Sequence, residues 1–145
     1  MDIFDLIRKD HRQIENLFSE IERAGKTQKL YEYFNQLYEE ISLHTEVEEK
    51  IFYPAISNYQ DTERLLDEAQ KEHHEIKQML EDIESFSPIS DEFKQKLSEL
   101  KQAIQHHVQE EENEVFTQVQ ESMSKAEREQ LGNDFEAVKS QQQSE

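Results

Sequence analysis

The chain contains two similar halves, with histidines at matching positions in each. Residues 8–18 read RKDHRQIENLF and residues 70–80 read QKEHHEIKQML, so an acidic residue, a histidine and apolar residues three and seven places later recur. A second pair of matching segments follows about thirty residues on, HTEVEEKIFYP from His44 and HVQEEENEVFT from His107. Because apolar side chains three and seven residues apart lie on one face of a helix, this repeat favours a helical fold built from two copies of one arrangement.

Few residues are available for tight turns, since the 145 residues include two glycines and two prolines. This scarcity argues against hairpins and bulges and supports a helical chain. Apolar periodicity predicts a first helix from about residue 3 to 24, a second from Thr27 to near Pro54, a third from about residue 62 to Ser87 and a fourth beginning after Ser90. We therefore predict an all-α, up-down-up-down four-helix bundle with a short C-terminal fifth helix.

The expected helix ends follow from local residue types. We expect Gly25 to end the first helix in the left-handed conformation, and Ser124 with Glu127 to form a capping box for the fifth helix. Thr27, Asp61 or Thr62, and Ser90 are the other expected helix starts. Residues 1–121 are then assigned to the bundle, and residues 122–145 to the short fifth helix and a frayed tail, SQQQSE.

The lengths of the predicted helices place the histidines of both halves at one level of the bundle. Measured from the turns that join neighbouring helices, their heights differ by about one to three residues, at most roughly 4.5 Å at 1.5 Å per residue. A glutamate lies four residues after the second histidine of each half, one helical turn along the same face. The predicted metal ligands are His11, His44, Glu48, His73, His107 and Glu111.

A metal site has to be weighed against an ordinary hydrogen-bonded core. A single histidine on an apolar stripe is usually a core residue, but four at one level with two aligned glutamates favour a pair of metal ions. Nitrogen and oxygen ligands with open positions suit iron or manganese, with zinc as a substitute. We interpret His74 and His106, each about 100° off its stripe, as facing solvent. Glu110 and Glu112 are interpreted as solvated surface, and the tyrosines as packing residues.

Composition excludes several other functions. A net charge of −18 should repel phosphate backbones, so no nucleic-acid partner is expected. Without cysteines there are no disulfides, iron–sulfur clusters or thiol catalysis. The N-terminus lacks an apolar signal segment and no stretch approaches eighteen apolar residues, so we expect no membrane association and a cytoplasmic location.

These segments resemble the hemerythrin-like, or HHE cation-binding, family from His11 to about Phe116. The motifs are DH and EH in the first and third helices, H-x-x-x-E-E-x-x-F-Y-P in the second and H-x-x-x-E-E in the fourth. The resemblance implies a four-helix bundle around a non-haem centre of two iron ions, bridged by carboxylates and usually by an oxo or hydroxo group. By the same resemblance Glu48 and Glu111 would be the bridging carboxylates.

Two positions differ from the oxygen-carrying hemerythrins. Lys77 stands where the carriers have a further histidine, and Glu111 where they have an aspartate. The ligand set is more similar to that of bacterial di-iron proteins linked to iron-centre repair and to nitric oxide or oxidative stress. Those proteins often carry an N-terminal cysteine-bearing segment, which this sequence does not contain.

Our leading hypothesis is a di-iron protein whose centre binds or reacts with dioxygen, peroxide or nitric oxide. The alternatives are an iron donor or repair protein, a peroxide-consuming oxidoreductase served by an unidentified redox partner, and a metal-sensing interaction module. A binding protein is favoured over a dedicated enzyme because no proton donor is evident beyond the ligands. The sequence leaves the oligomeric state open.

Overall fold

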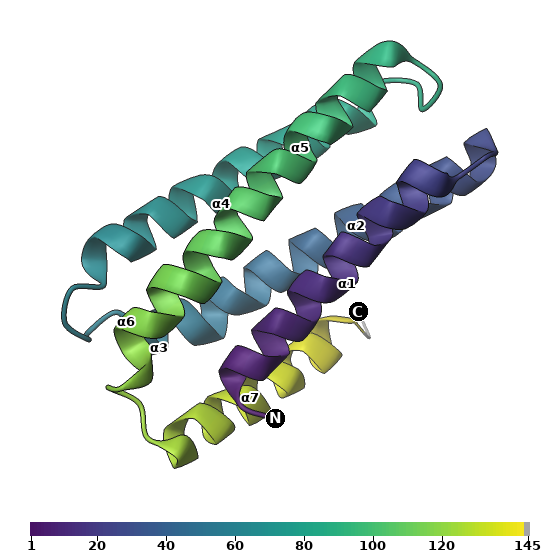
Figure 1. Ribbon diagram of the computed structural model, residues 1–145. Helices are drawn as coiled ribbons and strands as arrows, with labels where there is room; N and C mark the ends of the chain where they lie inside the picture. Colours follow the sequence, from purple (N-terminus) through teal and green to yellow (C-terminus); the bar gives the residue numbers. More distant parts are fainter. Residues whose placement is uncertain (144–145) are drawn as a thin grey trace.

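The computed structural model describes residues 1–143, which fold as four antiparallel rods and a fifth helix outside them (Figure 1). The first and third rods are single helices, α1 (Ile3–Arg23) and α4 (Glu63–Glu84). The second rod joins α2 (Thr27–Val47), the π-helical turn η1 (Glu48–Phe52) and α3 (Tyr53–Ile56). The fourth joins α5 (Asp91–Glu110), the π-helical turn η2 (Glu111–Val115) and α6 (Phe116–Gln120). Helix α7 spans Lys125–Gln143.

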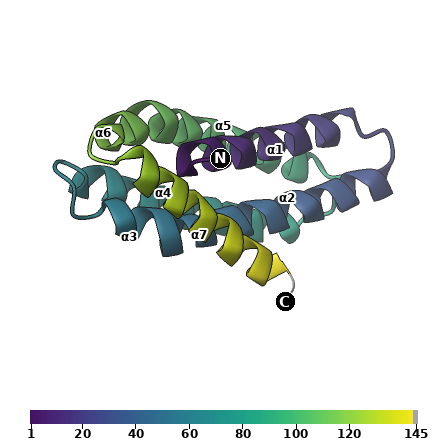
Figure 2. The same cartoon turned by 90° about the horizontal axis from the view of Figure 1, so that it is seen from below.

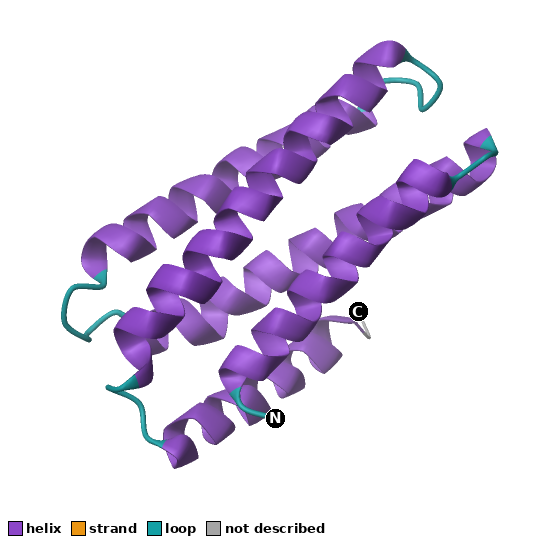
Figure 3. Cartoon of the chain, in the orientation of Figure 1, coloured by secondary structure: helices purple, strands orange, loops and turns teal. Residues whose placement is uncertain are grey.

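The predicted all-α bundle is confirmed, and no strand occurs among the described residues (Figure 3). Helix α1 packs along α2 and α4 packs along α5, so each half of the sequence forms one hairpin. Helix α7 runs across the outside of the α1–α2 hairpin (Figure 2). None of the described helices is both long and apolar enough to cross a lipid bilayer.

A π-helical turn begins at the same glutamate in each half. The carbonyl of Glu48 accepts from the backbone N–H of Tyr53, and the carbonyl of Glu111 accepts from that of Phe116, five residues later in both cases. Such single-turn π-helices widen the helix locally and are frequent at functional sites. Here the wider turn brings the residue five places after Glu48 back toward the bundle interior.

Two apolar clusters fill the bundle on either side of a layer of buried polar residues. One cluster gathers around Phe4, Phe52 and Phe116, and the other around Phe34 and Phe93. The buried polar and charged side chains of the described residues are Asp10, His11, His44, Glu48, Thr62, His73, His107 and Glu111. All six ligands predicted from the sequence are among these residues, and the other two are Asp10 and Thr62.

The helix ends match the expectations in part. Ser90 accepts from the N–H of Phe93 and Ser124 from that of Glu127, as predicted. The left-handed conformation expected at Gly25 is wrong: no described glycine has a positive φ, and α1 ends through an extended Ala24. The cap expected at Thr27 is also wrong, because Thr27 is already helical and Lys26 precedes it without a side-chain cap.

Helix α7 continues further than expected. It reaches Gln143, well into the tail that was expected to fray, and residues 144–145 lie outside the described residues. Gln142 near its end donates to Glu46 of α2 at 3.1 Å, and Phe135 in its middle is fully buried. These contacts with the bundle explain why the helix persists beyond its last apolar residue.

The first prediction concerns the two glycines. A Cβ at Gly132 would lie 2.6 Å from the backbone oxygen of Met1, whereas a Cβ at Gly25 would meet nothing within 4 Å. Alanine normally stabilises a helix interior relative to glycine, but overpacking costs about 1–3 kcal/mol. We expect Gly132→Ala to lower the free energy of unfolding by this amount in urea denaturation, and the control Gly25→Ala to lower it by less than about 0.5 kcal/mol. A stabilised Gly132→Ala would contradict the close packing of α7.

Candidate metal centre

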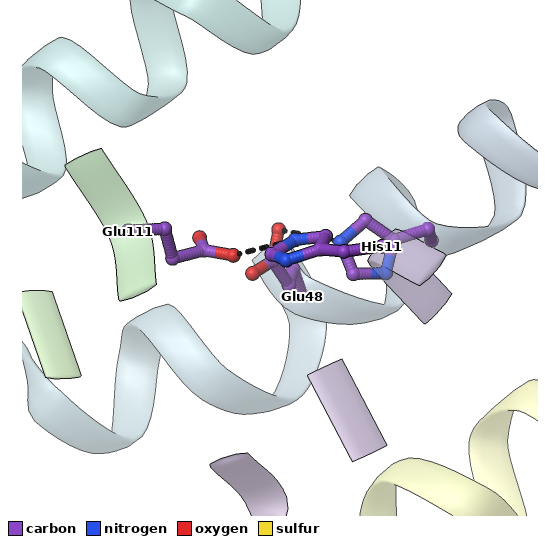
Figure 4. A group of neighbouring side chains, drawn as sticks. His11, Glu48 and Glu111 are labelled. Atoms are coloured by element: carbon purple, nitrogen blue, oxygen red, sulfur yellow. Dashed lines mark ion pairs between the residues drawn. The ribbon is translucent and has the colours of Figure 1, made fainter. Parts of the chain in front are cut away.

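The structure brings all six predicted ligand residues together in the polar layer of the bundle. Each is at least 95 % buried, and each of the four rods contributes at least one. The side chains of Glu111 and His11 point toward one another, with Glu48 beside them (Figure 4). This convergence is what the matching heights of the four histidines predicted.

Each buried glutamate contacts one histidine from each half of the chain. Glu48 Oε1 lies 3.3 Å from Nε2 of both His44, on its own rod, and His73, on the opposite hairpin. Glu111 lies 3.7 Å from Nε2 of His107 and 3.1 Å from Nε2 of His11. Both carboxylates therefore sit between imidazoles of the two halves, the position that a bridging ligand occupies.

The potential ligand atoms form two overlapping groups, each compact enough for one cation. The first group contains His11, His44, Glu48 and Glu111, and the second contains Glu48, His73 and His107. Glu48 belongs to both, so the two positions are adjacent and share a carboxylate.

The hydrogen bonding of the predicted ligands also indicates whether they fit bound cations. Nε2 of His11 and His44 and one oxygen each of Glu48 and Glu111 are buried without a hydrogen bond. Buried polar atoms are rarely left without a hydrogen bond, and the nearest partners of both imidazole nitrogens here are the cage carboxylates themselves. All four face the interior of the cage, where cations would satisfy them.

Sequence reasoning missed one residue of the cage, Tyr53. Its hydroxyl donates to Glu111 at 2.7 Å and lies 3.3 Å from Glu48 and 3.2 Å from Nε2 of His73. Burial, followed by the charges of Glu111 and Glu48, raises its pKa well above the ordinary value, so the hydroxyl stays protonated. The sequence signal was the tyrosine of the F-Y-P motif, but ordinary helical geometry places it off the Glu48 face, and only the π-helical turn brings it inward.

Within each half, the acidic residue before the first histidine accepts from the second histidine. Asp10 lies 2.8 Å from Nδ1 of His44, and Glu72 lies 2.9 Å from Nδ1 of His107. These contacts leave Nε2 of each imidazole facing the cage. A carboxylate on the outer nitrogen fixes the ring orientation and makes the inner nitrogen a better metal donor.

Across the two halves, the acidic residue after each buried glutamate holds the remaining histidine. Glu112 lies 2.7 Å from Nδ1 of His11, and Glu49 lies 3.5 Å from Nδ1 of His73. The interpretation of Glu112 as solvated surface was therefore wrong. The signal was its place in the E-E pair that follows the fourth histidine, equivalent to Glu49 in the second helix.

Positive charges support this outer layer unequally. Lys139 of α7 contacts Asp10 at 2.5 Å, and Arg12 contacts Glu112 at 2.5 Å. Both cations lie on the His11–His44 side. No lysine or arginine of the described chain pairs with Glu72 or Glu49, which hold the other two histidines.

The sequence matches a known protein family. The hemerythrin HHE cation-binding domain matches residues 2–119. This chain belongs to the hemerythrin HHE cation-binding family. A DNA nickase of Nostoc is 36 % identical over 97 % of this chain and 40 % of its own length, and an uncharacterized hemerythrin-like protein of Schizosaccharomyces pombe is 27 % identical over 94 % and 68 %. The chain thus spans about two fifths of the length of the Nostoc relative.

A solved structure has the same fold. The crystal structure of a hemerythrin HHE cation-binding domain-containing protein from Mycobacterium kansasii superimposes with a TM-score of 0.87. It is 22 % identical, and the alignment covers 97 % of this chain and 86 % of that one. The HHE domain is therefore a cation-binding helical bundle. Helix α7 lies beyond the residues that the family model matches.

The two remaining histidines lie where the sequence indicated. His74 and His106 are exposed, as predicted, and Lys77 is exposed one turn beyond His73. Lys77 and Thr45 line a surface cleft of about 520 Å³ that reaches His73 between α2 and α4. A small molecule could approach the cage of this HHE domain along that cleft.

In the HHE domain without metal, His44 and His73 hold protons at neutral pH. Burial lowers the pKa of His44, but the charge of Glu48, the hydrogen bond to Asp10 and the close contact with Glu48 outweigh it and raise the pKa to about 10. Burial also opposes protonation of His73, but hydrogen bonds to Glu48 and Glu49 raise its pKa to about 9. For Glu48, burial is outweighed by the charge of His44, which holds its pKa well below the ordinary value.

The second prediction is the pH dependence of the metal-free HHE domain. A histidine with a raised pKa contributes stability that is fully present below its unfolded value of 6.5 and is lost as the pH rises through 9 to 10 for His73 and His44. We expect the free energy of unfolding to fall across this window by up to about 1.4 kcal/mol per pH unit for each imidazole. Urea denaturation in EDTA between pH 6 and 10 measures it, and a flat profile would contradict the charged cage.

Proposed function

We propose that this protein holds two iron ions, with Glu48 and Glu111 bridging them, and that the centre binds or reacts with dioxygen, peroxide or nitric oxide. The observation that carries the proposal is that the two groups of ligand atoms share Glu48. A single cation would need only one group, whereas two adjoining groups joined by a carboxylate suit a dinuclear centre. The donor set of imidazoles and carboxylates suits iron or manganese, with zinc as a substitute.

The protein residues around the cage suit a reactive small ligand. Bound iron would supply the electrons for chemistry with such a molecule. The two ligand groups offer three or four side chains each, which leaves positions for an exogenous ligand. The outer carboxylates fix the imidazoles, and the protonated hydroxyl of Tyr53 supplies a hydrogen-bond donor inside the cage.

A second candidate is an oxidoreductase that consumes peroxide or nitric oxide. Tyr53 favours it, because its hydroxyl is the proton donor that was not evident in the sequence. A group that donates a proton in the reacting state contributes roughly 10²–10⁴-fold to a rate. The two candidates share the same metal centre and differ in whether Tyr53 transfers its proton during turnover.

The name of the Nostoc relative is not carried over to this chain. DNA nickase describes a protein of which this chain spans 40 %. A net charge of −18 opposes approach to a phosphate backbone, and we propose that the partners of this domain are small molecules and a redox protein, with no nucleic acid among them.

The third prediction tests the metal centre directly. After anaerobic reconstitution with ferrous iron, we expect about two irons per chain, measured by elemental analysis against protein concentration. His73→Ala removes a cage imidazole and should lose at least one iron. Its control is His74→Ala, which removes the exposed neighbouring imidazole and should retain both.

Two outcomes would reject this proposal. The first is a chain without iron after reconstitution, which would favour a metal-free interaction module. The second is an iron-loaded, reduced protein whose absorption spectrum is unchanged by dioxygen, peroxide and nitric oxide, each added anaerobically or in a controlled amount. A spectrum that changes with one of them identifies the class of ligand.

The fourth prediction separates binding from turnover. Tyr53→Phe removes the hydroxyl and retains the ring, so iron content should stay at about two per chain. If the centre is an enzyme, we expect peroxide or nitric oxide consumption to fall about 100-fold, as for the loss of a general acid. Tyr59→Phe is the matched control, because that hydroxyl contacts Glu127 outside the cage. Equal turnover in both variants would remove Tyr53 as the proton donor.

A further inference from the structure

A second cluster of ligand atoms lies on the surface beside the cage. It consists of Glu72 on α4 with His106 and Glu110 on α5, whose potential ligand atoms lie within 4.8 Å of one another. Nε2 of His106 is 3.0 Å from Glu110 and 3.4 Å from Glu72. The imidazole is 66 % exposed and the two carboxylates are half-buried, so the cluster opens to solvent.

The cluster repeats the ligand pair of the cage one residue earlier on the same helix. His106 and Glu110 are four residues apart on α5, and His107 and Glu111 have the same spacing where α5 continues into η2. An imidazole and a carboxylate at this spacing converge on a point beside the helix. Glu72 adds a carboxylate from the neighbouring helix, which completes a mixed nitrogen and oxygen set suited to a divalent transition metal.

The local charge also favours a cation. Among the described residues, no lysine or arginine forms an ion pair with Glu72 or Glu110. By contrast, Glu112 of η2 is paired with Arg12. The ion-pair partners of these two neighbouring carboxylates are histidines, His106 and His107, and a bound cation would add the positive charge that a lysine or arginine supplies elsewhere.

Glu72 connects this cluster to the cage. One of its oxygens accepts from Nδ1 of His107 at 2.9 Å, while the other faces His106. A cation on Glu72 withdraws electron density from the carboxylate and weakens it as an acceptor. His107 would then be a weaker donor to the metal that it holds.

We propose that Glu72, His106 and Glu110 form a third, solvent-open site for a divalent transition-metal cation, linked to the cage through Glu72. Three protein ligands leave the remaining coordination positions to water, because the cluster opens to solvent. Binding at this surface site does not require iron in the cage. The linkage to the cage rests on the proposed function.

Calorimetric titration of the iron-loaded protein with zinc tests the surface site. We expect one further zinc per chain in the wild type and a loss of affinity of at least about tenfold in His106→Ala, because even changes behind a ligand cost 10–100-fold. His74→Ala is the matched control, an exposed histidine of α4 outside the cluster, and should bind zinc as the wild type does. Equal affinities in the wild type and His106→Ala, or no further zinc at millimolar concentration, would overturn the site.

The same site can be counted if the cage does not take up iron. The protein prepared in EDTA and dialysed against zinc should then hold one more zinc per chain in the wild type than in His106→Ala. Equal counts would overturn the surface site. A difference of one, together with failed iron loading, would reject the iron proposal alone.

The linkage has its own readout. In the iron-loaded wild type, saturation of the surface site with zinc should shift the absorption spectrum of the iron centre, and the shift should vanish in His106→Ala, which leaves Glu72 and His107 in place. Zinc that binds without any spectral change would overturn the linkage and leave the surface site standing.

Discussion

The burial of two carboxylates at the centre of the bundle is the constraint on which the rest of this structure depends. Glu48 and Glu111 are fully enclosed, between two apolar clusters, where an uncompensated charge would cost several kcal/mol (about 3–5 when one partner of a buried pair is lost). Each contacts imidazoles from both halves, and the hydroxyl of Tyr53 donates to Glu111. The same two carboxylates that require this compensation join the four rods at one level.

A layer of carboxylates on the outer side of the histidines orients the imidazoles around the cage. Each outer nitrogen faces an acidic side chain, so the inner nitrogens all point to the same space. The layer is not uniform, because Lys139 and Arg12 pair with the acceptors of His44 and His11, while those of His73 and His107 have no lysine or arginine partner within residues 1–143. The two groups of ligand atoms therefore lie in different electrostatic surroundings, and Lys139 of α7 is one source of the difference.

The sequence predicted the bundle and the burial of the six residues because helical periodicity and turn positions fix both height and face. It did not predict the inward position of Tyr53, since that depends on a π-helical turn that changes the period locally. Nor did it predict the role of Glu112, because a surface glutamate and one that reaches around a helix to an imidazole have the same local pattern. Gly25 was misassigned because a short helix connection can also be made with an extended residue. A contact between rods decided the case of Glu112 alone, and local backbone geometry decided the other two.

Each hairpin supplies a carboxylate that lies behind a histidine of the other hairpin. Glu112 of the second hairpin orients His11 of the first, and Glu49 of the first reaches His73 of the second. Neither hairpin alone contains a complete set of oriented imidazoles, although each carries the same motif. An ancestral single hairpin would have needed to pair with a copy of itself, as a symmetric dimer, to build the same centre. In this chain the two hairpins are joined, and α7 packs against the first of them.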